Sequence, residues 1–437
     1  MALSSAPTRA LAWPNISTPL ALCAVALGFS GSSIYVLDPL RPFHFGAALI
    51  LALIALDRQW RRAVLDSALT RWLAATAAVL LIQLLWVEHT DRYLRFLAFL
   101  LTGVCYTVLA DALVRRRVDF AEGLYPIVLY WLITAAMPIY DAWTGSGRFR
   151  MSYPLTGGVW YNINDMATAL VFANLIWLLI KRKLSFPLYL TCWFYALAMN
   201  RRTILLAASV LGLLYLLGYA RRLKHGNRAL LAGALLATSA AALVLHHGNF
   251  QFGTLPSLAP RAQVGAGAVL TPASTAAADE TIQSAQAGED MPPVDEIGVI
   301  ANNGDHSTAY RVQLLLDMYA QIRDMPWWQW AFGLGLGQLN LMWPATDAQW
   351  ASPHFFCWLE MFFHLGLLWV AFLGWLLVRS DSTGRICLIT AAIAGMAPSS
   401  MIYLQPFWFL VGVCVAVLPQ KNGAPSRPAA FPQHASQ

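Results

Sequence analysis

The strongest constraint on this chain is a succession of long apolar runs separated by short polar turns. A helix needs about 20 apolar residues to cross the hydrocarbon core of a bilayer, and most of the runs approach that length. Hydrophobic residues make up 58% of the 437 residues and charged residues 12%, whereas a soluble domain has about 25% charged residues. Because a water-soluble fold could not bury so much apolar surface, we expect an all-α, polytopic membrane protein.

The runs predict about twelve transmembrane helices. They are expected near residues 16–37, 42–57, 69–87, 93–114, 124–143, 164–180, 185–200, 203–219, 229–246, 355–378, 386–402 and 406–419. The chain is then divided into nine spans over residues 1–246, a large loop over 247–354, three spans over 355–419 and a tail over 420–437.

The basic residues of the turns predict the orientation, because lysine and arginine in short loops are retained in the cytoplasm. Alternate turns contain the basic clusters, which are Arg58, Arg61 and Arg62; Arg115 to Arg117; Lys181 to Lys183; Arg221, Arg222, Lys224 and Arg228; and Arg379 and Arg385. The turns between them are poorer in basic residues. We therefore expect both termini in the cytoplasm and the loops 144–163 and 247–354 on the opposite side.

The large loop has two parts of different character. Residues 253–305 are mainly Ala, Pro, Thr, Ser and Gly with scattered acids, and such a segment buries too little surface to offset its ordering entropy, so we predict disorder. Residues 308–323 have apolar side chains at helical spacing, which predicts an amphipathic helix on the membrane surface. These side chains are Val312, Leu315, Leu316 and Tyr319.

Several classes of function are disfavoured by the residue pattern. The net charge of +7 comes from short clusters in turns rather than from the basic face of a soluble domain, so we expect no nucleic-acid partner. The six cysteines lie in or beside apolar segments without a CxxC pair, which favours packing roles. The glycines at 333, 335 and 337 lack the spacing and the strand–helix context of a dinucleotide fingerprint. Without metal-ligand spacing such as H-E-x-x-H, we expect neither a metal nor a cofactor.

Three arginines on the loop side are candidates for binding a diphosphate. Arg201 and Arg202 occupy a tight turn that should be poor in basic residues, and Arg311 lies on the predicted loop helix. Guanidinium groups are permanently charged and match phosphate oxygens bidentately. Each arginine alone could instead snorkel to the interface or form a structural ion pair.

His354 is the candidate general base, because imidazole is the side chain whose ordinary pKa lies nearest neutrality. It stands where the large loop re-enters the membrane, although a lone histidine is also commonly structural. Glu360 follows about two helical turns later; it could orient His354, act as the base itself or pair with an arginine. His364, inside the tenth span, is assigned to helix packing.

The smaller loop ends with Asn162, Asn164 and Asp165 just before a span. Their side chains could bind sugar hydroxyls. Asn and Asp at the start of a helix are also common caps, and we expect at least one of the three to be a cap.

Taken in order, these features resemble the O-antigen ligase and polysaccharide polymerase superfamily of bacterial inner membranes. The resemblance covers roughly residues 150–380, and it depends on the order and sidedness of motifs that are individually loose. The motifs are Asn162-x-Asn164, NRRT from Asn200, YRVQLLLDMYAQIRDMPWWQWAFGLGLG from Tyr310 and PHFFCWLEMFFHLG from Pro353.

The resemblance implies an enzyme that transfers a glycan from undecaprenyl diphosphate to a hydroxyl acceptor at the periplasmic face, without a metal. Ligases of the superfamily use lipid A–core as the acceptor, and polymerases extend the carrier-linked chain. By match to the motifs, Arg201 corresponds to the arginine of an SRG-like turn, Arg311 to a loop arginine, and His354 to a loop histidine that is proposed as the base.

The chain also departs from the family pattern. Phe355 follows the histidine where the family often has Asn, and Gly366 comes twelve residues after it rather than eleven. The turn reads NRRT, so Arg202 could share or replace the role of Arg201. The choice between ligase and polymerase stays open, with the ligase as the first hypothesis.

A transporter or flippase for a lipid-linked glycan is the rival from a different class. Its outline of many spans and few buried charges would be similar. Transporters often contain repeats and paired broken helices near the midplane of the bilayer. The sequence has no corresponding halves, and its charges gather at one face, which favours surface chemistry.

Overall fold

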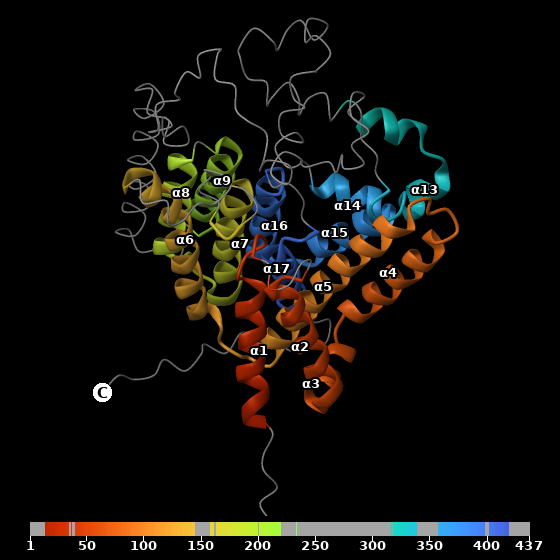
Figure 1. The fold of residues 1–437 in the computed structure, drawn as a ribbon, viewed down its shortest axis with the longest axis horizontal. Coiled ribbons are helices and arrows are strands. Elements are labelled where there is room, and N and C mark those ends of the chain that lie inside the picture. Colours follow the sequence, from red (N-terminus) through yellow and green to blue (C-terminus); the bar gives the residue numbers. More distant parts are fainter. Residues whose placement is uncertain are drawn as a thin grey trace, which may run out of the picture.

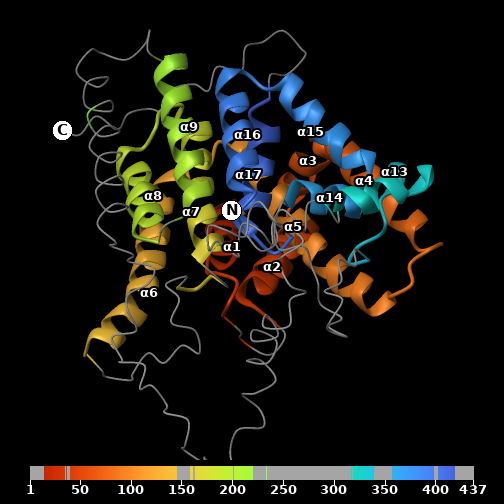
Figure 2. The same cartoon turned by 90° about the horizontal axis from the view of Figure 1, so that it is seen from above.

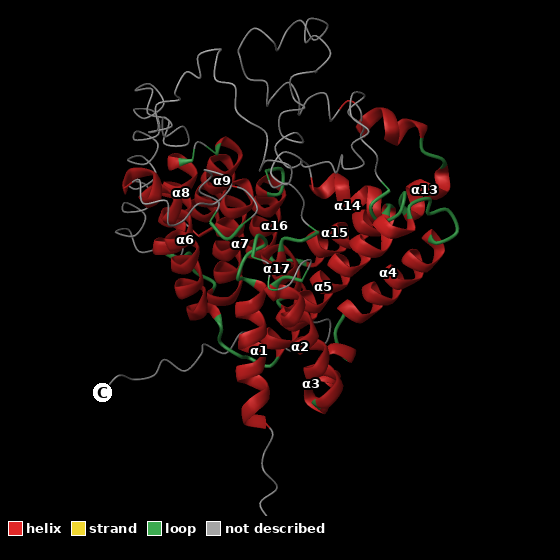
Figure 3. Cartoon of the chain, viewed as in Figure 1, coloured by secondary structure: helices red, strands yellow, loops and turns green. Residues whose placement is uncertain are grey.

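The structure is a computed structural model that describes residues 14–34, 36, 40–144, 158–160, 163–199, 201–219, 233, 316, 318–338, 357–397 and 402–418. These residues form helices joined by short turns, and no strand occurs among them (Figure 3). The prediction of an all-α protein is thereby confirmed.

The helices of the described residues overlap all of the predicted spans except 229–246, which lies outside this part of the chain apart from Gly233. They are α1 (Pro14–Gly28), α2 (Pro42–Leu56), α3 (Arg58–Leu65), α4 (Leu69–Gln83), α5 (Thr90–Arg115), the 3₁₀ helix η1 (Ala121–Gly123), α6 (Leu124–Thr144), α7 (Ile163–Lys181), α8 (Phe186–Ala198), α9 (Arg202–Tyr219), α13 (Trp327–Phe332), α14 (Cys357–Leu365), α15 (Leu367–Arg379), α16 (Ser382–Ala394) and α17 (Gln405–Ala416).

Helix length limits how many of these elements could span a bilayer alone. Among the described residues, α5 and α7 are long and apolar enough to do so, and α3 with α4 would make a third span bent by 77°. In the other apolar helices, the stretches whose side chains the structure describes have 10–17 residues. The helices are thus compatible with a membrane, and the count of about twelve spans stays a prediction.

The centre of the molecule is formed by α5, α7 and α17, with α6, α8 and α9 on one side and α4, α13 and α15 on the other (Figures 1 and 2). Nearly all of α7 is buried. Small residues let α5 and α17 approach closely: Trp408 lies over Gly103, and Gly412 packs against the carbonyl of Thr107. The hydroxyl of Thr107 donates a hydrogen bond to Trp408 O at 2.9 Å. Packing of this kind is typical of helices in membranes.

Four of the basic turns lie at one end of the helices and contact one another or acidic partners. The linking contacts are Arg116 Nη2 to Gln59 Oε1 at 3.1 Å, Lys181 Nζ to Asp119 Oδ2 at 2.6 Å, and Arg182 Nη1 to Asp381 Oδ2 at 2.7 Å. The sequence predicted that these turns lie on the same side of the protein, and in the structure they do. The location of this side in the cytoplasm stays a prediction.

The segment expected as one span over residues 355–378 is divided into α14 and α15. The division falls at Gly366, whose φ of +61° lies in the left-handed region, where glycine is favoured. A Cβ there would lie 2.6 Å from the carbonyl oxygens of Trp330 and Ala331. The division therefore depends on a tertiary contact with α13.

Residues 318–324, here called the loop helix, are helical. Met318, Ile322 and Met325 pack with Phe363 of α14, whereas Tyr319, from the apolar face that the sequence predicted, is 67% exposed. The helix is therefore fixed to the protein by a different face, and the two described residues of the predicted face, Leu316 and Tyr319, are exposed. Val312, Leu315 and residues 253–305 lie outside the described part of the chain.

Candidate functional site

Arg201 lies in the turn between α8 and α9, where its guanidinium is held by two acceptors. Nε donates to Met199 O at 2.7 Å, and Nη1 donates to Asn164 Oδ1 at 3.3 Å. Asn164 is in the first turn of α7, 37 residues earlier in the chain. Two of the residues that the sequence singled out are thus brought together.

Asp165 is next to this contact and is buried in the first turn of α7. A carboxylate at this end of a helix is stabilised by the helix dipole, so its position favours the structural role over sugar binding. Asn162, Arg311 and His354 lie outside the described residues, and so does the side chain of Arg202.

The Arg201 end of α7 is linked to α14 through α16. Thr168 Oγ1, one turn after Asn164, donates to Ala394 O at 3.4 Å, and Trp358 Nε1 donates to Ala392 O at 2.9 Å. Both views show α16 between α7 and α14 (Figures 1 and 2). Trp358 is the second residue of α14, and His354 precedes this helix by three residues. The helix that contacts Arg201 and the helix that follows His354 in sequence therefore both bond to the last turn of α16.

Glu360 is fully buried on α14, with its Oε1 3.6 Å from Nε2 of His364. His364 Nδ1 lies 3.4 Å from Gly335 O, and its ring packs edge-on against Phe96. His364 thus has the packing position expected for it. Pairing with His364 was not among the three roles that the sequence suggested for Glu360, and it places this carboxylate inside the protein.

Gln83, the last residue of α4, is a buried polar residue that was not predicted from the sequence. Its side chain is fully buried, and Nε2 donates to Phe332 O and to His364 O, each at 2.6 Å. Burying an amide costs free energy unless it is hydrogen-bonded. The sequence does contain a sign of this residue, since Gln83 is a single polar residue in the apolar run LLIQLLW. Polar residues inside membrane segments are rare unless they have a role.

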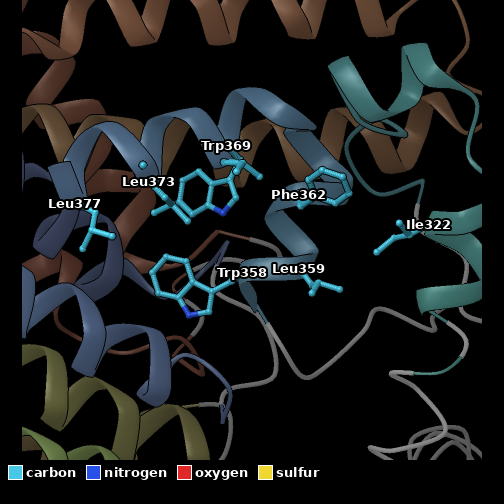
Figure 4. Close-up of a pocket in the computed structure, with 9 residues that line it drawn as sticks. Ile322, Trp358, Leu359, Phe362, Trp369, Leu373 and Leu377 are labelled. Carbon is cyan, nitrogen blue, oxygen red and sulfur yellow. The ribbon is translucent and has the colours of Figure 1, made fainter.

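An apolar pocket of about 440 Å³ opens beside the junction of α14 and α15 (Figure 4). Trp358 and Trp369 stack along it with ring centroids 6.0 Å apart. Every lining side chain is apolar; besides these two tryptophans they are Ile322, Leu359, Phe362, Val370, Leu373, Gly374 and Leu377. The pocket suits a hydrocarbon chain rather than a sugar.

Within the described ranges, no group of three or more His, Cys, Asp or Glu side chains is placed to hold a metal ion. The chain matches no model of a known protein family, and a search of curated proteins gives no match either. The resemblance to the O-antigen ligase superfamily accordingly depends on the motifs in the sequence.

Proposed function

We propose that this chain is a metal-independent glycosyltransferase of the bacterial inner membrane, which transfers a glycan from undecaprenyl diphosphate to a hydroxyl of lipid A–core at the periplasmic face. The observation that supports this most is the Arg201–Asn164 contact, made at helix ends that connect through α16 to the start of α14. It holds a candidate phosphate-binding cation at the end of α7, and both α7 and α14, the helix that follows the candidate base in sequence, bond to the end of α16.

In this mechanism, the acceptor hydroxyl attacks the anomeric carbon and His354 takes its proton. The bond between that carbon and the diphosphate oxygen breaks, and negative charge develops on the leaving diphosphate. Arg201, Arg202 and Arg311 stabilise this charge. Because two acceptors already fix the Arg201 guanidinium, little reorganisation is needed at the moment of reaction.

The apolar pocket is proposed to hold part of the polyprenyl chain of the donor. A Cβ built on Gly374 meets nothing within 4 Å, so a large side chain can enter the pocket from there. Gly374→Trp is expected to raise the KM for the donor about tenfold, because each buried CH₂ group contributes about 0.8 kcal/mol. The measurement is the donor concentration dependence of transfer by protein in nanodiscs. Gly374→Ala is the control and should keep the wild-type KM; equal KM values for all three proteins would rule out this use of the pocket.

The function is tested by introducing the gene into a strain that lacks its O-antigen ligase and separating the lipopolysaccharide on a gel. A ligase restores the ladder of capped core. Deleting the gene from its own host separates ligase from polymerase: loss of all capped core indicates a ligase, and core capped by a single repeat indicates a polymerase. Counterflow of labelled donor into liposomes without a covalent product would instead favour the transporter.

A further inference from the structure

Helix α3 has one face packed on the protein and one face exposed, and it lies next to α2 at the lower edge of the fold in Figure 1. Side chains three or four positions apart share a face of a helix. The packed face contains Trp60, Ala63 and Val64. The exposed face contains Arg58, Arg61, Arg62 and Leu65. Three cations and one apolar side chain are therefore presented together.

Contacts with the neighbouring helices fix this orientation of α3. The guanidinium of Arg116, at the end of α5, lies over the Trp60 ring, 4.6 Å from its centroid. Arg116 Nη2 also donates to Gln59 Oε1 at 3.1 Å. At the other end of α3, Thr70 Oγ1 of α4 donates to Val64 O at 2.7 Å. The arginine face is therefore held outward by packing on the opposite face.

The arginines of this face differ from other basic residues at the same end of the helices. Three of those others are paired with carboxylates at 2.6–2.8 Å: Arg115 with Asp111, Lys181 with Asp119, and Arg182 with Asp381. No carboxylate in the described part of the chain forms an ion pair with the three arginines of α3. Like charges at this spacing destabilise a helix, so an anion bound at this face would stabilise it.

The direction of α3 suits a position at a membrane surface. The axes of α3 and α4 differ by 77° across a short break. With α4 crossing the bilayer, as its apolar sequence predicts, α3 runs along the surface rather than onward into solvent. Leu65 is 62% exposed beside the arginines. An apolar side chain next to cations fits the boundary between lipid headgroups and acyl chains.

We propose that the exposed face of α3 binds the headgroups of anionic phospholipids. Guanidinium groups keep their charge and match phosphate oxygens, and basic clusters beside a membrane segment are typical sites for such headgroups. Arg58 and Arg62 lie one helical turn apart, so a lipid with two phosphates, such as cardiolipin, can contact both. The site is at the end of α8 opposite the Arg201 turn, and it does not depend on the proposed function.

Titration of the purified full-length protein with cardiolipin in a neutral detergent, with bound lipid counted by native mass spectrometry, tests the proposal. Arg62→Gln is expected to raise the Kd for cardiolipin about fivefold, because each arginine near an anionic lipid surface contributes about 1 kcal/mol. The triple variant Arg58→Gln, Arg61→Gln, Arg62→Gln should raise it roughly 100-fold. Phosphatidylcholine, which has no net charge, should bind the wild type and the variants equally and more weakly than cardiolipin binds the wild type.

Arg182→Gln is the matched control, because it removes a cation at the same end whose charge is paired with Asp381. It should change the Kd for cardiolipin less than about twofold. Replacing all three arginines of α3 by lysine keeps the charge and should retain most of the binding. Should the triple glutamine variant fail to fold, the comparison of Arg62→Gln with Arg182→Gln decides alone.

Three results would overturn the proposal. The first is a wild-type Kd for cardiolipin in the triple glutamine variant, or equal values for Arg62→Gln and Arg182→Gln. The second is a wild-type protein that binds phosphatidylcholine as tightly as cardiolipin. The third is displacement of cardiolipin by an equal concentration of inorganic diphosphate, which would identify a site for soluble phosphates rather than for lipid.

Discussion

His354→Gln is expected to lower the rate of glycan transfer by about 10²–10⁴-fold, the usual contribution of a positioned general base. Glutamine retains a hydrogen-bonding side chain but cannot take the proton of the acceptor hydroxyl. The KM for the donor should change little, because the arginines, rather than the histidine, are proposed to bind the diphosphate. The measurement is kcat and KM for purified protein in nanodiscs, with lipid-linked glycan and lipid A–core as substrates.

His89→Gln is the control for this prediction. His89 is an exposed histidine whose backbone, not its side chain, makes the two bonds to Gln338, so the variant should keep the wild-type rate. Full turnover by His354→Gln would remove the base from the mechanism. An equal loss in both variants would point to general destabilisation rather than to proton transfer.

The helical fold could be predicted because the physics behind it is local: apolar runs between basic turns require helices that bury their backbone polar groups. The division at Gly366 could not. Residues 355–378 are apolar throughout apart from Glu360, His364 and glycines, and the break arises where the carbonyls of Trp330 and Ala331 meet Gly366. That contact joins segments whose proximity no periodicity reveals.

The loop helix shows a second limit of sequence patterns. The sequence in and around it has two apolar stripes, one through Leu316 and Tyr319 and the other through Met318, Ile322 and Met325. Helical spacing identifies stripes of both kinds, but it does not say which one faces protein and which faces lipid or solvent. Only the packing of the second stripe with Phe363 decides this.

The candidate site also has parts that the sequence predicted and parts that it did not. The alternation of basic turns was enough to predict that the NRRT turn and the start of α7 lie on the same side. The Arg201–Asn164 contact agrees with this prediction. Glu360 was recognised as an unusual charge, but its partner His364 was not predicted. The two residues are four apart on one helix, a spacing at which side chains are neighbours, so the pair could have been read from the sequence. Gln83 is a weaker signal than a charge, because burying a neutral amide in an apolar run costs less free energy than burying an ionised group.

Arg201→Ala is expected to lower kcat/KM for transfer by about 10²–10³-fold, the usual loss when one preorganised stabiliser of a developing charge is removed. Arg201→Lys should recover only part of the rate, because an ammonium group keeps the charge but lacks the planar fork that matches phosphate oxygens. Asn164→Ala should cause a smaller loss than Arg201→Ala, since it leaves the guanidinium present with Met199 O as one of its acceptors. Steady-state kinetics with the lipid-linked donor would establish this order.

Arg323→Ala is the matched control, because it removes an arginine from the loop helix without touching the Arg201 turn. Arg323 is exposed and bonds to Asp324 at 2.9 Å, and this contact lowers the pKa of the Asp324 carboxyl. Its charge is thus already shared with a neighbouring carboxylate, and transfer should continue at the wild-type rate. If Arg323→Ala and Arg201→Ala reduced the rate equally, the loss would reflect overall positive charge rather than a cation fixed by Asn164. If Arg201→Ala had no effect, the diphosphate would have to be bound without it, and the contact with Asn164 would be structural.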